Sequence, residues 1–141
     1  MLSVGQLKVI MYVPPHDPAK TWRLEVRPVI ESAYYACVKN NDESAYHEYV
    51  DRWAKRHPNV KAKYPYDGYF LQLVNGIRAD GGYNASKVTT DKIMSIYKGT
   101  KWLLEGQRRA SIICALFGPD VQIPLEVVAQ ELPTDLDQDS L

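Results

Sequence analysis

The longest periodic stretch of the chain is TTDKIMSIYKGTKWLLEGQRRASIICALF, residues 89–117. Apolar residues recur along it at helical spacing, from Ile93 and Ile96 to Phe117. Such spacing lines up side chains on one face of an α-helix. We therefore predict that most of this stretch is helical, with Gly106 breaking or bending it into two helices.

Further helices are predicted outward from this stretch, because similar apolar stripes lie between turn residues. Ser3 and Gln6 fit a capping box ahead of the first. The stripes begin at Val4, Ile30, Tyr46, Phe70 and Leu125. Alternating charged and apolar residues allow at most a minor extended segment near residues 20–27. The expected fold is all-α, a single domain of about six short-to-medium helices joined by short loops.

Charge divides the chain into two parts. All 17 basic residues precede Gly118, together with 11 acids, whereas residues 119–141 contain six acids and no Lys or Arg. We predict a helical domain over residues 1–133 and an acidic C-terminal tail over residues 134–141. This asymmetry indicates electrostatic contact with a partner, or between the tail and the body. Asp135, Asp137 and Asp139 are the candidate contact residues of the tail.

Known chemical motifs are absent from the sequence. It has no phosphate-binding glycine pattern, no His or Cys spacing typical of a metal site, and no nucleophile motif. Cys37 and Cys114 have apolar neighbours, which favours reduced core thiols. No catalytic, cofactor-binding or metal-binding residues are predicted. Neither a signal peptide nor a membrane span is recognisable, so we predict a cytoplasmic protein, or one made in a host cytoplasm, without membrane contact.

Two basic segments, residues 52–63 and 87–109, make nucleic acid the alternative partner. A helix-turn-helix fits poorly in either register tested between residues 73 and 99. Charge neighbours at helical spacing, such as Lys101 with Glu105, are expected to weaken the field of these segments. The candidate residues for contact with a partner or nucleic acid are Arg56, Lys61, Lys63, Tyr64, Tyr66, Lys98, Arg108 and Arg109.

Aromatic composition points towards protein contacts, because the chain has ten Tyr and three Trp but two Phe. Tyrosine suits half-buried positions and interfaces, although a small domain also uses it in the core. The leading hypothesis is a non-enzymatic assembly or partner-binding protein. Its contacts would be Tyr- and Trp-bearing helix faces and the acidic tail. Such a chain is typical of small accessory or structural proteins of viruses, phages and mobile elements. A small helical enzyme with an unrecognised pocket is the remaining alternative.

Overall fold

The chain folds as a mixture of helices and strands, so the all-α prediction is wrong. A computed structural model describes residues 2–13, 17, 19, 23–40, 43–56, 69–84, 86 and 93–132. In these residues the helices are α1 (Ala33–Lys39), α2 (Glu43–Arg56), α3 (Tyr69–Asp80) and α4 (Gln107–Phe117). The strands are β1 (Leu2–Ser3), β2 (Lys8–Val13), β3 (Arg23–Pro28), β4 (Ser95–Tyr97), β5 (Leu103–Glu105), β6 (Gln122–Ile123) and β7 (Glu126–Val128). Two 3₁₀ turns, Val4–Gln6 and Val29–Glu31, complete the described elements.

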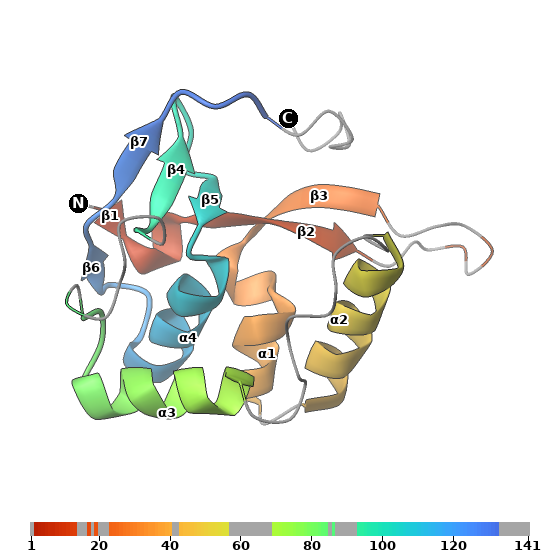
Figure 1. Cartoon of the computed structure of the whole chain (residues 1–141), viewed down its shortest axis with the longest axis horizontal. Coiled ribbons are helices and arrows are strands. Elements are labelled where there is room, and N and C mark those ends of the chain that lie inside the picture. The colour runs from red at the N-terminus through yellow and green to blue at the C-terminus, as the bar shows by residue number, and fades with distance from the viewer. Residues whose placement is uncertain are drawn as a thin grey trace.

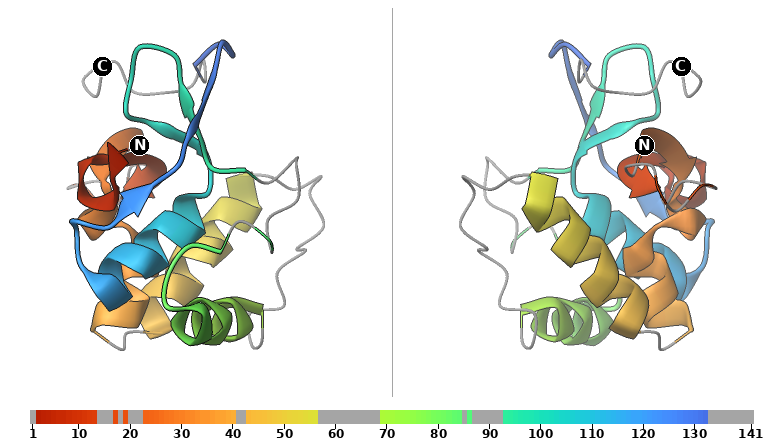
Figure 2. Two further views of the ribbon diagram at one scale, coloured as in Figure 1. Left: turned by 90° about the vertical axis from the view of Figure 1, so that its left-hand side faces the viewer. Right: turned by 90° about the vertical axis from the view of Figure 1, so that its right-hand side faces the viewer.

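The strands form three small sheets. β1 pairs with β6, and β2 pairs with β3, both antiparallel. The third sheet has the order β5-β4-β7, in which β4 is antiparallel to β5 and parallel to β7. A bridge between Lys8 and Trp102 connects the second sheet to the third. Figures 1 and 2 show the third sheet projecting at one end of the molecule, with the helices gathered at the other.

Strand β2 replaces the predicted first helix. The capping pair Ser3 and Gln6 begins only a single 3₁₀ turn, in which the Ser3 amide donates to Gln6 Oε1 at 3.3 Å. The following residues, KVIMYV, are mostly β-branched or aromatic, and all six pair with β3. A short apolar run of this kind fits a buried strand as well as a helix. The extended segment predicted near residues 20–27 overlaps β3, which is the antiparallel partner of β2.

Strands β4 and β5 replace the first part of the predicted helix over residues 89–117. Gly99 has φ of 78°, and the Thr100 amide donates to the Tyr97 carbonyl oxygen at 3.1 Å, so the chain reverses there. The Tyr97 amide then donates to the Trp102 carbonyl oxygen at 3.0 Å. Glycine adopts positive φ without the penalty of a Cβ atom, and this turns the segment into a hairpin. Only its last part, α4 after Gly106, is helical.

Strand β7 replaces the predicted last helix, which was expected to begin at Pro124, after β6 ends at Ile123. Pro124 lies between β6 and β7, which belong to different sheets, and it has no amide hydrogen to donate. Val127 and Val128 are β-branched and favour extended backbone. Their partner, β4, comes from about thirty residues earlier in the chain, a parallel pairing that local periodicity does not encode.

The other helix predictions agree with the structure over α1, α2 and α3. Ser32 begins α1 by accepting the Tyr35 amide at 3.0 Å. Gly81, with φ of 73°, ends α3, and the Gly82 amide donates to the Ile77 carbonyl oxygen. Helix α4 packs against α1, α3 and both 3₁₀ turns. It therefore lies at the centre of a core whose most deeply buried large side chains are Leu7, Met94, Leu103, Ile112, Ile113 and Ile123.

Candidate functional site

The buried serine hydroxyls join two helices. Ser111 Oγ donates to the Gln107 carbonyl oxygen at 2.7 Å, and Ser32 Oγ donates to Ser111 Oγ at 2.8 Å. Each hydroxyl proton is thereby used in a hydrogen bond within the α1–α4 contact. A nucleophilic serine instead gives its proton to an adjacent base, so this pair is best explained as structural.

The thiols are also part of the core. Cys37 and Cys114 are buried and are not joined by a disulfide, as predicted. Burial raises the pKa of Cys114, and the positive charge of Lys39 opposes this rise. A thiol with a raised pKa forms little of the reactive thiolate. Within the described ranges, no three His, Cys, Asp or Glu side chains are grouped so that they could hold a metal ion.

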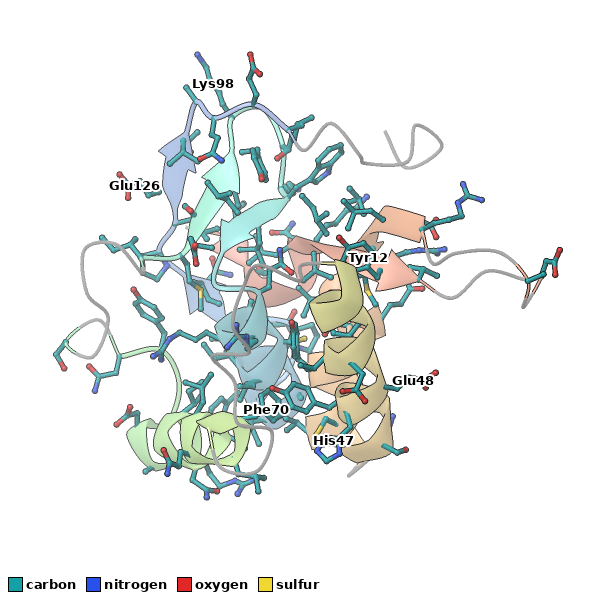
Figure 3. The ribbon with its side chains drawn as sticks, turned by 45° about the vertical axis from the view of Figure 1, so that its right-hand side comes forward. Tyr12, His47, Glu48, Phe70, Lys98 and Glu126 are labelled. Carbon is teal, nitrogen blue, oxygen red and sulfur yellow. The ribbon has the colours of Figure 1, made fainter. Side chains whose placement is uncertain are left out.

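An aromatic cluster accounts for several of the tyrosines. Tyr46 stacks on Phe70 with ring centroids 4.4 Å apart, and Tyr34 meets Tyr49 edge to face at 5.6 Å. Tyr46 and Tyr49 are 3% and 6% exposed. Figure 3 shows Phe70 between α3 and α2, with its ring directed into the molecule. These aromatic side chains therefore point into the core of the folded chain and do not form a surface for contact with a partner.

Burial of Tyr49 should make the protein less stable at alkaline pH. Desolvation raises the pKa of Tyr49 well above its ordinary 10.0, and Tyr34 adds to the rise. The unfolded chain therefore loses this proton first. The stability that this protonated hydroxyl contributes is fully present below pH 10. Above pH 10 the free energy of unfolding falls by about 1.4 kcal/mol for each pH unit. Urea unfolding of Tyr49→Phe between pH 9 and 11 should show a shallower decline than the wild type, and an unchanged slope would contradict this. Burial also raises the pKa values of Tyr97 and Cys114, so these two groups contribute to the slope that remains.

Two lysines occupy the turn between β4 and β5, and we call Lys98 and Lys101 the lysine tip. Both side chains are exposed, and neither forms an ion pair within the part of the chain that the structure describes. The turn is held by Thr100, whose Oγ1 donates to the Tyr97 carbonyl oxygen at 2.8 Å and accepts the Trp102 amide at 3.0 Å. Figure 3 shows Lys98 projecting from the end of the sheet. The lysine tip is thus an ordered, positively charged projection.

Among the strands that the structure describes, β7 is an edge of the third sheet. The Glu126 amide donates to the Met94 carbonyl oxygen at 3.0 Å, and the Lys98 amide donates to the Val128 carbonyl oxygen at 2.9 Å. Because alternate residues of a strand direct their backbone groups to opposite sides, the N–H and C=O of Val127 point away from β4. The Val127 side chain is 58% exposed. Glu126 is exposed beside it and points outward in Figure 3. This edge therefore offers backbone hydrogen bonds next to an exposed apolar side chain.

The structure places some of the predicted contact residues and separates them. Lys98 is at the lysine tip, whereas Arg108 and Arg109 are half-buried in the first turn of α4, beyond the other end of β5. Arg56 is the last residue of α2, and its side chain lies outside the described part. The remaining candidates also lie outside the described residues: Lys61, Lys63, Tyr64, Tyr66, Asp135, Asp137 and Asp139. The boundary between a domain and a tail at residues 133–134 stays a prediction for the same reason.

Lys101 and Val127 belong to the candidate surface but were not among the predicted contact residues. Lys101 was paired with Glu105 as a helical neighbour four positions away. In the structure Glu105 is the last residue of β5 and Lys101 precedes that strand, so an extended backbone of about 13 Å separates them, in place of one helical turn. The predicted last helix includes Val127, outside its apolar stripe of Leu125, Val128 and Leu132. Adjacent valines after Pro124 were the sequence signal for an exposed strand.

Evidence on the function of this chain comes from its own sequence and geometry. No protein family, curated protein or solved structure matches it. Among the described residues, the structure contains no helix that is both long and apolar enough to cross a membrane.

Proposed function

We propose that the chain is a non-enzymatic partner-binding protein that pairs the open edge of β7 with an extended, basic segment of a protein partner. The observation that carries the proposal is the outward-facing Val127, whose side chain is 58% exposed on an edge strand. Addition of a strand to an open edge is a common mode of peptide recognition, in which backbone hydrogen bonds supply affinity. Buried thiols and hydrogen-bonded serines in the core support a role without catalysis.

The charges around the edge favour a basic partner segment. Glu126 and Glu131 are exposed on β7 and shortly after it. The sequence that follows adds three aspartates and no basic residue. An incoming strand with lysine or arginine at alternate positions would meet these carboxylates, which would direct the partner to the edge and disfavour acidic segments.

The test uses a synthetic peptide, Lys-Val-Lys-Val-Lys-Val-Lys, titrated into the full chain at low salt by calorimetry. Val127→Pro removes the outward amide without touching the ladder to β4, since proline is tolerated on edge strands. We expect this variant to bind about tenfold more weakly, the size of effect that loss of a backbone hydrogen bond with its burial produces. Val127→Ala keeps the amide and is the matched control, for which a loss of at most about threefold is expected.

Equal affinity of Val127→Pro and the wild type would exclude pairing along β7. A second copy of the chain is the other occupant that the edge allows, and light scattering distinguishes it. A mass twice that of the monomer, restored to the monomer by Val127→Pro, would replace the basic partner with self-association. Circular dichroism of both variants checks that the fold is retained. Nucleic-acid binding through residues 52–63 and 87–109 stays a prediction, because many of those side chains lie outside the described ranges.

A further inference from the structure

We propose that the acidic C-terminal segment of this chain, residues 131–141, binds the lysine tip of the same molecule. The lysine tip consists of the exposed Lys98 and Lys101 in the turn between β4 and β5. This inference does not depend on the proposed function, because it concerns a contact within one chain and requires no partner.

The path of the chain brings Val128, which precedes the acidic segment by three residues, next to Lys98. Residues 95–97 of β4 run parallel to residues 126–128 of β7, so the carboxyl ends of both strands lie at the same end of the sheet. At that end, the Lys98 amide donates to the Val128 carbonyl oxygen at 2.9 Å. The backbone that leads to the acidic segment therefore leaves β7 at a point in contact with Lys98. Figure 1 shows β4 and β7 running side by side in the same direction.

The lysine tip has positive charge that nearby described acids do not neutralise. Glu105 and Glu126 are both aligned with Ser95, at the opposite end of β4 from the turn. The ion pairs of Arg27 with Glu25 and Glu31 belong to the β2–β3 hairpin and its following turn. Lys8 adds a further exposed cation close by, because its amide donates to the Lys101 carbonyl oxygen at 2.9 Å.

The acidic segment has the charge and the length to reach this surface. It contains Glu131, Asp135, Asp137 and Asp139, and no Lys or Arg follows Arg109. The nine residues from 133 to 141 span up to about 30 Å when extended. Exposed charges interact over roughly 8 Å at physiological ionic strength, so free acidic peptides would bind weakly. Attachment beside Lys98 keeps the carboxylates at high effective concentration and favours the contact within one chain.

Paramagnetic relaxation measures this contact from the tip side. Gln138→Cys provides a site for a nitroxide label within the acidic segment, while Cys37 and Cys114 are buried. At about 20 mM salt we expect the amide signals of Gly99 and Thr100 to fall at least about twofold, and to recover at about 500 mM salt. Asp135→Asn/Asp137→Asn/Asp139→Asn should abolish the broadening in the same labelled chain. Broadening that persists unchanged in this triple-Asn variant, or none in the wild type, would overturn the proposal.

Changes on the tip side provide a second test. In unlabelled protein, Lys98→Gln/Lys101→Gln should shift the amide signals of residues 135–139 to the positions they adopt in the wild type at high salt. Lys39→Gln is the matched control, because Lys39 is exposed at the end of α1 and should leave those signals unchanged. A mixture of labelled and isotopically enriched chains separates cis from trans contact. Broadening of equal strength in that mixture would overturn binding within one molecule in favour of binding between molecules.

Discussion

Replacing Gly106 with alanine should lower the free energy of unfolding by about 2–5 kcal/mol, because two separate costs arise at this position. Gly106 precedes α4 with φ of 96°, a conformation that residues with a Cβ atom rarely adopt. The added Cβ would also lie 2.5 Å from Met94 Cγ and 3.2 Å from Met94 Cβ. Met94 is fully buried, and its inner side-chain atoms cannot swing away without moving the backbone of the segment that leads into β4.

Gly81→Ala is the matched control for this prediction. Gly81 has a similar positive φ of 73°, but a Cβ built on it meets nothing within 4 Å. Its substitution should therefore cost about 1–2 kcal/mol, which is the backbone term alone. Urea unfolding monitored by circular dichroism measures both variants. Equal losses of stability in Gly106→Ala and Gly81→Ala would contradict the close approach of Met94 to Gly106.

Helices could be predicted where their signals are local. The apolar stripe of α2 and the glycines after α3 specify their structure within a few turns, and both helices form as expected. The strands could not be predicted in this way, because each obtains its hydrogen bonds from a distant segment. Leu2 pairs with Ile123, and Ser95 pairs with Glu126. Short strands that are buried on both faces lack the alternation of apolar and polar residues that marks a half-exposed strand. All three residues of β4 are buried in this way.

The residues of the lysine tip and of the β7 edge could be predicted from the sequence only in part. Lys98 could be selected from the sequence because it is a cation without a helical charge partner. Its neighbours could not be selected, since the contact with Val128 and the approach of Lys8 to Lys101 depend on sheet pairing. The tyrosine excess suggested surface contacts, but Tyr46 and Tyr49 are in the core. Composition does not distinguish a tyrosine that packs inside from one that binds a partner.

Replacing Phe70 with alanine should destabilise the protein by about 3–5 kcal/mol, the usual cost of deleting a buried aromatic ring. Phe70 is 2% exposed and stacks on Tyr46 at 4.4 Å, with Tyr34 at 6.1 Å. The ring therefore links α3 to both α1 and α2 through one aromatic cluster. Its loss leaves a cavity bordered by Tyr46 and Tyr34, and the edge-to-face contact of Tyr34 with Tyr49 opposes collapse of that cavity.

The neighbouring position on α3 supplies the control, since Leu71→Ala changes an equally apolar residue in the same helix. Leu71 is 48% exposed, so this substitution should alter stability by about 0.5 kcal/mol or less. Phe70→Leu should fall between the two variants, because it fills part of the volume and loses the ring contacts, worth about 0.5–1.5 kcal/mol beyond burial. Equal effects at Phe70 and Leu71 in urea unfolding would mean that α3 does not pack on the tyrosine cluster through Phe70. The order Phe70→Ala, Phe70→Leu, Leu71→Ala, from largest loss to smallest, follows directly from burial of the ring between three helices.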